Sequence, residues 1–179
     1  MRRVLRGNMY LVKHMLPVKL RENYMTNVGE VLDLVYKEDS NFVCRKDGEW
    51  KFSNIYGESN MHSLFHFKMS EQLKQAIFKT LPKEEMKIPP SSFTINKYLP
   101  GAYLPKHRDS AGSYWKFHLI FLTCDQPHLK VYNEQGEGFL VEEKPGALCE
   151  MPIDILHEVT EIGKDERPKY SLVLAWGLR

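Results

Sequence analysis

Eight short segments of strand-forming residues follow one another in the second half of the chain, and they limit its possible folds more than any other feature. The segments are 92–98, 104–109, 116–123, 129–133, 138–142, 147–150, 155–160 and 169–176. Turn sequences with glycine or proline separate several of them, such as LPG at 99–101 and KPG at 144–146. Many short strands at this spacing predict a β-sandwich or barrel.

The first half of the chain has a helical pattern instead. Asn27 and Glu30 have the spacing of a capping box in front of apolar residues that share one helix face. Ser70 can cap a second helix, which Pro82 ends. Two prolines in KIPPSS, residues 87–92, mark the change from helices to strands. We therefore predict a mainly β, α+β fold: a double-stranded β-helix, or jelly roll, with flanking N-terminal helices.

The length of 179 residues suits a single domain. We expect residues 1–90 to form a helical support and lid region and residues 91–179 to form the jelly-roll core. No apolar run approaches the roughly 20 residues of a membrane-spanning helix, and a net charge of +2 does not by itself indicate a nucleic-acid partner. The 3 cysteines are widely spaced, which is typical of a reducing compartment, so a cytoplasmic location is expected.

A histidine and a carboxylate lie two positions apart in one predicted strand. His107 and Asp109 therefore face the same side, while Arg108 points away. One metal ion can bind both side chains, and His157, in a later predicted strand, is the obvious third ligand. Two histidines and one carboxylate, with the other metal positions open, are the ligands used by non-heme iron(II) oxygenases.

A basic residue begins the last predicted strand. Lys169 and Ser171 share one face of this strand. A cation that points into a barrel is costly unless it meets an anion. A dicarboxylic cosubstrate would supply that anion, and the Ser171 hydroxyl would add a donor beside it. Arg167 is the alternative cation, because it follows the distal histidine more closely.

These features together resemble the iron(II)- and 2-oxoglutarate-dependent oxygenase superfamily over about residues 92–178. The resemblance rests on HxD, a distal histidine, and a basic residue followed two positions later by serine. KPGALCEMPIDILHEV and KYSLVLAW are similar to the turn before the family's distal histidine and to its last core strand. Lys169 stands where most members carry arginine. The resemblance implies iron(II) held by the two histidines and the aspartate, with 2-oxoglutarate and O2 consumed and succinate and CO2 released.

Within the superfamily, HRD followed by KFHLIFLT is similar to the aspartyl/asparaginyl β-hydroxylases and the related cis-proline hydroxylases. Lys116 and His118 match a basic-x-His pair that helps to hold 2-oxoglutarate in that group, and Tyr98 is a further candidate contact to the cosubstrate. The implied substrate is an amino-acid or peptidyl side chain or another small molecule. The polar and aromatic segment at 45–60 is the best candidate for contacting it.

Two alternative functions remain open at this point. A nucleic-acid oxidative demethylase of the same superfamily carries a second arginine six residues after the cosubstrate cation, but position 175 is alanine here, so a nucleic-acid partner is not expected. A non-catalytic, cupin-like module that binds a small molecule belongs to a different functional class. Succinate formation with iron(II) separates that module from an oxygenase.

Overall fold

The computed structural model describes residues 4–5, 18–44, 61–109 and 114–177. The helices are α2 Val28–Lys37 and α3 Glu71–Thr80, with single 3-10 turns η1 Asp39–Asn41, η3 His66–Lys68 and η4 Glu85–Lys87. The strands are β1 Val4–Leu5, β2 Lys19–Arg21, β3 Val43–Cys44, β4 Met61–Phe65, β5 Ser92–Tyr98, β6 Leu104–His107, β7 Tyr114–Phe121, β8 Leu129–Tyr132, β9 Gly138–Val141, β10 Leu148–Glu150, β11 His157–Val159 and β12 Lys169–Gly177. All eight predicted strands are present as β5 to β12, with ends that shift by two residues or fewer.

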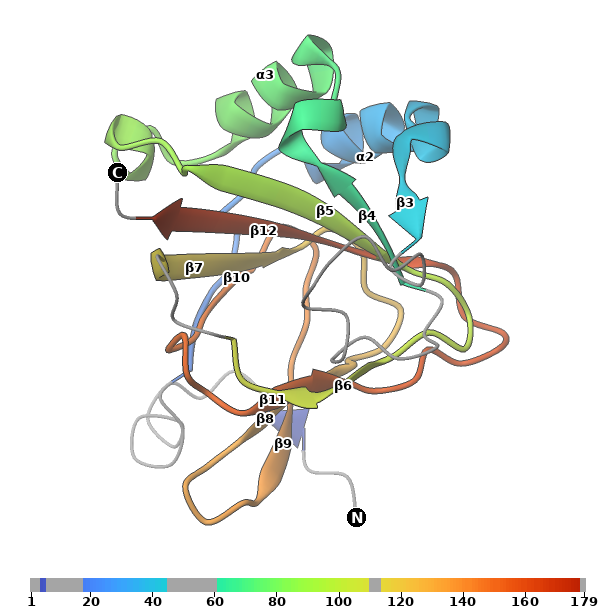
Figure 1. The fold of residues 1–179 in the computed structure, drawn as a ribbon, viewed down its shortest axis with the longest axis vertical. Coiled ribbons are helices and arrows are strands. Elements are labelled where there is room, and N and C mark those ends of the chain that lie inside the picture. Colours follow the sequence, from blue (N-terminus) through green and yellow to red (C-terminus); the bar gives the residue numbers. More distant parts are fainter. Residues whose placement is uncertain (1–3, 6–17, 45–60, 110–113, 178–179) are drawn as a thin grey trace.

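The strands form two sheets. The five-stranded sheet has the order β1-β9-β8-β11-β6, and the seven-stranded sheet has the order β2-β10-β7-β12-β5-β4-β3. Neighbouring strands are antiparallel except for the β1–β9 pair, which is parallel. Figure 1 shows α2 and α3 on one side of the seven-stranded sheet and the five-stranded sheet on its other side. The prediction of a mainly β fold with N-terminal helices on one face is confirmed.

The helix-covered face of the seven-stranded sheet has its own apolar core. Val31 of α2 and Leu73 of α3 pack in one cluster with Leu172 and Leu174 of β12. Alternate side chains of a strand point to opposite faces, so Ser171 of the same strand faces the five-stranded sheet. The central strand β12 is therefore covered on both faces.

A second core fills the space between the two sheets. Phe121 of β7 packs there with Val131 of β8 and Val141 of β9. Cross-strand partners point to the same face of a sheet, and side chains alternate along each strand. The strand register therefore shows which other residues also face this core. Phe121 pairs with Ser171, and Val131 pairs with His157.

The start of α3 follows the sequence prediction, but the start of α2 does not. Ser70 caps α3, because its Oγ accepts a hydrogen bond from the backbone N–H of Leu73 at 3.2 Å. Asn27 precedes α2 in the left-handed region at φ 50°, and its side chain makes no capping hydrogen bond. The predicted capping box is therefore wrong. Asparagine holds this position instead because it tolerates the left-handed conformation.

The first half of the chain contributes more than helices. β2 pairs with β10 at one edge of the seven-stranded sheet, and β4 pairs with β5 nearer the other edge. The predicted division into a helical segment at 1–90 and a β core at 91–179 is therefore incomplete. The strands of the first half were not predicted, because they are short and lack a clear two-residue alternation of apolar and polar residues.

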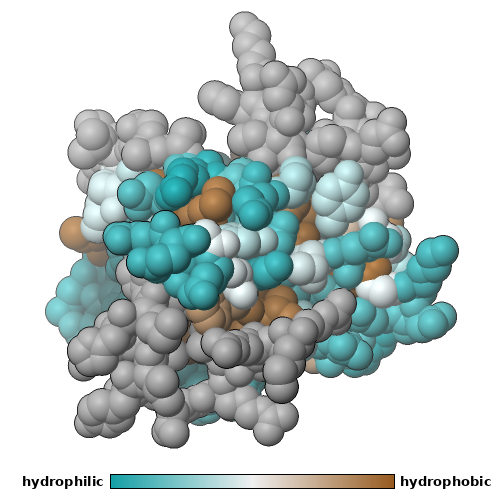
Figure 2. Space-filling view, turned by 90° about the horizontal axis from the view of Figure 1, so that it is seen from below, coloured by the Kyte–Doolittle hydropathy of each residue, from teal (hydrophilic) through white to brown (hydrophobic). Residues whose placement is uncertain are grey.

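The other sequence predictions concern the surface, the cysteines and one loop. No helix of the described residues has the length and apolar character needed to cross a membrane. Cys44, Cys124 and Cys149 are unpaired. The segment at 45–60, predicted to contact substrate, lies outside the described residues. The face seen in Figure 2 is mostly hydrophilic where residues are coloured, with apolar residues visible between them.

Candidate active site

Two histidines lie side by side on the inner face of the five-stranded sheet. His107 ends β6, and the pairing of β6 with β11 places it directly opposite His157. The two imidazole centroids are 4.4 Å apart. His157 also pairs with Val131, which belongs to the core between the sheets. Both imidazoles therefore face this interior.

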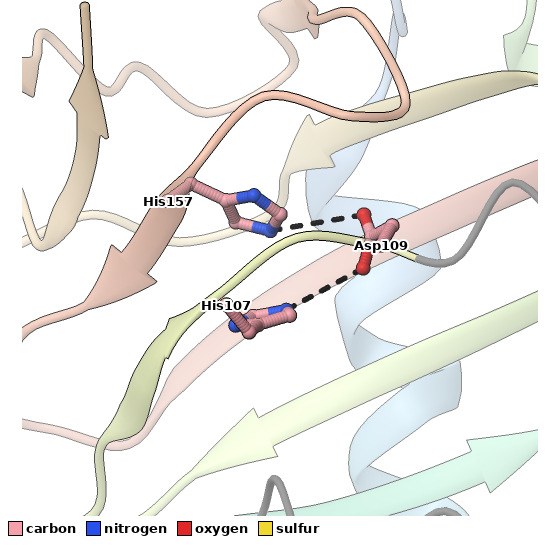
Figure 3. A group of neighbouring side chains, drawn as sticks. All are labelled: His107, Asp109 and His157. Atoms are coloured by element: carbon pink, nitrogen blue, oxygen red, sulfur yellow. Dashed lines mark ion pairs between the residues drawn. The ribbon is translucent and has the colours of Figure 1, made fainter.

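Asp109 completes the group of three. β6 ends at His107, so Asp109 lies beyond the strand, but its carboxylate still reaches both rings (Figure 3). Oδ1 is 3.4 Å from Nε2 of His107, and Oδ2 is 3.7 Å from Nε2 of His157. Arg108, between the first two ligands, is exposed and donates to the backbone oxygen of Asp154. The structure thus brings the three predicted ligands together and directs Arg108 away.

Backbone carbonyls fix which nitrogen of each histidine faces the carboxylate. Nδ1 of His107 lies 2.7 Å from the carbonyl oxygen of Pro105, and Nδ1 of His157 lies 2.9 Å from that of Ile155. A carbonyl oxygen only accepts, so each Nδ1 carries the hydrogen and each neutral ring presents the Nε2 lone pair. This is how metal-binding histidines are oriented in proteins.

The surroundings of the two imidazoles shift their pKa values in opposite directions. Burial lowers the pKa of His107, but contact with the Asp109 carboxylate and the hydrogen bond to Pro105 outweigh burial, so the net pKa is raised. Burial dominates at His157 and lowers its pKa, while the charge of Asp109 opposes this in part. Asp109 therefore favours a positive charge at His107, which a proton or a metal ion can supply, whereas burial favours the neutral, metal-binding form of His157.

The three side chains fit a divalent ion. Their ligating atoms all lie within 4.8 Å of one another. Two ligand atoms that each lie about 2.1 Å from one ion are themselves about 3 to 4 Å apart, which matches the distances from Asp109 to the two imidazoles. Two lone pairs that face a carboxylate call for a cation between them. The donor set of two imidazoles and one carboxylate is the one that iron(II) oxygenases use.

The predicted cosubstrate cation lies in the same interior. Lys169 and Ser171 share the inner face of β12, and Nζ of Lys169 lies 5.3 Å from the ring centroid of Phe121. Tyr98 of β5 is the cross-strand partner of Lys169 and is buried as well. The structure therefore groups Lys169, Ser171 and Tyr98 on the face that the metal ligands also face.

Lys169 already has an anionic partner, which the sequence reasoning missed. Its ammonium is paired with Glu143, and the side chains are 6% and 0% exposed, respectively. The other oxygen of Glu143 accepts hydrogen bonds from the backbone N–H groups of His128 at 2.9 Å and Leu129 at 2.7 Å. Burial lowers the pKa of Lys169 to about 8, so the ammonium keeps its proton at neutral pH. Strand alternation could have indicated this partner, because Glu143 lies two residues after Val141 and therefore points toward the same face.

Arg167 is not part of this site. Its side chain is 84% exposed and forms a two-pronged ion pair with Asp125. Between the two candidate cations, the structure places only Lys169 between the sheets.

The predicted roles of Lys116 and His118 are wrong in this structure. Lys116 pairs with Trp176 and His118 with Leu174. Both partners belong to the core beneath the helices. Lys116 and His118 therefore face away from the metal ligands, on the other side of the seven-stranded sheet. The error arises because both faces of β7 are buried, so the sequence pattern does not show which face points inward.

Comparison with known proteins gives a fold and no close sequence relative. No protein-family model matches the sequence, and no curated protein sequence matches it. An oxidoreductase of the 2OG-Fe(II) oxygenase family from Burkholderia pseudomallei superposes with a TM-score of 0.69 and 12% identity, over 99% of this chain and 96% of that one.

Two prolyl hydroxylases are similar in the same way. The enzyme from Trichoplax adhaerens, in complex with a hypoxia inducible factor peptide fragment, has a TM-score of 0.67 and 11% identity over 94% of this chain and 86% of that one. The prolyl-4-hydroxylase from Pseudomonas putida has a TM-score of 0.61 and 15% identity over 93% and 95% of the two chains. This chain therefore has the fold of the 2OG-Fe(II) oxygenases and prolyl hydroxylases.

Proposed function

We propose that this protein is an iron(II)- and 2-oxoglutarate-dependent dioxygenase that hydroxylates an amino-acid or peptidyl side chain. One observation carries the proposal: the ligating atoms of His107, Asp109 and His157 lie within 4.8 Å of one another, and Nε2 of each histidine lies close to the Asp109 carboxylate. The shared fold supports the proposal, and we assign the two sheets to a double-stranded β-helix within a single domain. The three unpaired cysteines support a reducing compartment such as the cytoplasm.

Each metal ligand has a defined role in the proposed reaction. His107 and His157 supply neutral nitrogen donors, and Asp109 supplies a negative charge that favours a divalent ion. When bound, iron(II) would supply the chemistry by which O2 oxidises both 2-oxoglutarate, to succinate and CO2, and a C–H bond of the substrate, to C–OH. The chain itself binds, orients and keeps water away from the reacting groups.

The far carboxylate of 2-oxoglutarate would bind at Lys169. Ser171 and Tyr98 would add hydroxyl donors beside the ammonium. Glu143 already compensates this charge, so the cosubstrate carboxylate would have to share Lys169 with Glu143 or displace it. We therefore expect Glu143 to set the affinity for 2-oxoglutarate.

Three observations support the proposed substrate class. The Trichoplax prolyl hydroxylase was solved with a peptide fragment, and an amino-acid or peptidyl substrate agrees with the sequence resemblance described above. Position 175, where a nucleic-acid demethylase would carry a second arginine, is a buried alanine.

A substrate screen tests the proposal. The purified chain is incubated with iron(II), 2-oxoglutarate and separate pools of amino acids, peptides and methylated oligonucleotides, and succinate is measured. We expect release with an amino-acid or peptide pool, and His107→Ala should lose turnover and one bound metal ion per chain relative to the native protein. Turnover confined to oligonucleotides would overturn the substrate class, and a native metal content in His107→Ala would overturn the metal site.

A matched pair of variants tests the cosubstrate site. Lys169→Met should raise the concentration of 2-oxoglutarate needed for half-maximal turnover. Arg167→Ala removes the other candidate cation, which is 84% exposed, and should leave this concentration unchanged. The reverse result would show that Arg167 binds the cosubstrate.

A further inference from the structure

A second group of potential metal ligands lies on the opposite face of the seven-stranded sheet from the candidate active site. Glu85 of η4, His118 of β7 and Glu150 of β10 bring one ligand atom each to within 4.8 Å of the others. His118 and Glu150 are direct cross-strand partners. This face carries the core beneath the helices, because Trp176, which belongs to that core, packs on His118 with ring centroids 4.9 Å apart.

The hydrogen bonds of Tyr24 determine which nitrogen of His118 carries its hydrogen. The hydroxyl of Tyr24 donates to Oε2 of Glu85 at 2.9 Å. Burial and the bond to Glu85 raise the pKa of Tyr24, so the phenol keeps its single hydrogen for that carboxylate. The same oxygen lies 3.1 Å from Nδ1 of His118. Tyr24 must therefore accept at this contact, and Nδ1 of His118 must be the donor.

His118 is left with a lone pair that has no donor. It is 1% exposed, and within the part of the chain that the structure describes, its Nε2 has no hydrogen-bond partner. Oε1 of Glu150 lies 3.5 Å from this nitrogen. A neutral Nε2 and a carboxylate oxygen are both acceptors, and a buried acceptor that faces another acceptor is unfavourable unless a cation lies between them.

The guanidinium of Arg21 does not meet this need. Arg21 lies 2.6 Å from Glu85 and 3.6 Å from Glu150, but it pairs with the carboxylates and leaves Nε2 unpaired. The cluster thus has two carboxylates, one nitrogen lone pair and one guanidinium.

We propose that Glu85, His118 and Glu150 bind a divalent transition-metal ion. One imidazole nitrogen and two carboxylate oxygens form a donor set suited to Zn²⁺, and water completes the fourth position. Each carboxylate has about four lone-pair sites, so Arg21 can keep its contacts while the ion binds. The side chains of Arg21, Glu150 and Glu85 are 35%, 29% and 24% exposed, which gives the ion and its water a path from solvent.

The site would join three distant parts of the chain. η4 follows α3 in the helical layer, whereas β7 and β10 are neighbours in the seven-stranded sheet. An ion held by all three would fix the helical layer to the sheet, and binding to the folded state alone would raise the melting temperature. The proposal does not depend on the oxygenase function, because its ligands face the other side of the sheet.

Zinc content in matched variants tests the proposal. His107→Ala combined with His157→Ala removes the first metal site, and in this background any remaining zinc reports the second one. After dialysis we expect about two zinc ions per chain in the native protein and about one in this background. Adding Glu150→Gln should remove the remaining ion, whereas Glu84→Gln, a neighbouring glutamate whose side chain is 82% exposed, should not.

Thermal melting separates loss of the ion from loss of the fold. Zinc should raise the melting temperature of the background protein and of its Glu84→Gln derivative, and it should have no effect on a Glu150→Gln derivative that still melts cooperatively. A background protein that binds no zinc would overturn the proposal, as would a Glu150→Gln derivative that binds zinc as well as the background does. If only the first site fails to bind zinc, the background protein will contain as much zinc as the native protein.

Discussion

Glu143→Gln is the most informative single change, because it alters one atom that faces Lys169 and little else. The glutamine Oε1 can still accept the hydrogen bonds from the backbone N–H groups of His128 and Leu129. The amide group replaces the oxygen paired with Lys169 and carries no charge. The variant therefore leaves an ammonium that is 6% exposed without its anion.

The expected loss of stability is large. Removing one member of a buried ion pair costs about 3 to 5 kcal/mol, since the remaining charge stays buried without compensation. For a chain of 179 residues, each kcal/mol shifts the melting temperature by about 2 to 4 °C. Glu143→Gln should therefore melt roughly 10 °C below the native protein.

Urea unfolding and thermal melting at pH 7 measure the effect. Glu22→Gln is the matched control, because Glu22 is paired with Lys144 at 2.6 Å with 56% of its side chain exposed. An exposed pair contributes about 0 to 1 kcal/mol, so this control should unfold close to the native protein. In the presence of a divalent ion, 2-oxoglutarate should stabilise Glu143→Gln more than the native chain, because its carboxylate restores a partner to Lys169.

A double variant isolates the pair. Lys169→Met alone leaves Glu143 buried without its cation and should also be destabilised by about 3 to 5 kcal/mol. Combined with Glu143→Gln, it should be more stable than the sum of the two single losses predicts. Additive losses, or a loss below about 1 kcal/mol in Glu143→Gln, would refute the view that this buried pair is strongly coupled.

Two further predictions concern the fold. Gly101 and Gly146 both have φ +81°, but a Cβ at Gly146 would lie 2.6 Å from the backbone oxygen of Met25, whereas a Cβ at Gly101 meets no atom within 4 Å. Gly101→Ala should therefore lower the free energy of unfolding by about 1 kcal/mol, from the left-handed conformation alone. Gly146→Ala should lower it clearly more, as measured by urea unfolding, and equal losses in the two variants would contradict the steric reason. Ser70→Ala should destabilise the protein by about 1 kcal/mol, because α3 loses its N-cap, and an unchanged urea midpoint would show that this cap contributes nothing.

Local sequence patterns determined much of the architecture. The two-residue alternation and the glycine and proline turns located all eight strands from β5 to β12, because strand formation depends on neighbouring residues. The cap at Ser70 was visible for the same reason. The metal ligands His107, Asp109 and His157 were identifiable from residue type and spacing in predicted strands, and the structure brings them together.

Only the tertiary structure decided which face of each strand points inward. β7 is covered by the helical layer on one face and by the five-stranded sheet on the other, so both of its faces are rich in buried side chains. Alternation alone therefore did not show that Lys116 and His118 lie on the helix-covered face. Strand register and layer packing set that direction, and both depend on residues far away in the sequence.

The partners of the charged side chains were likewise decided by packing between distant segments. Glu143 meets Lys169, Arg167 meets Asp125, and His118 meets two glutamates only because the sheets and the η4 turn bring these residues together. A buried charge is stable only with a partner close to it. Sequence indicates that a partner is needed, but the three-dimensional arrangement determines which residue supplies it.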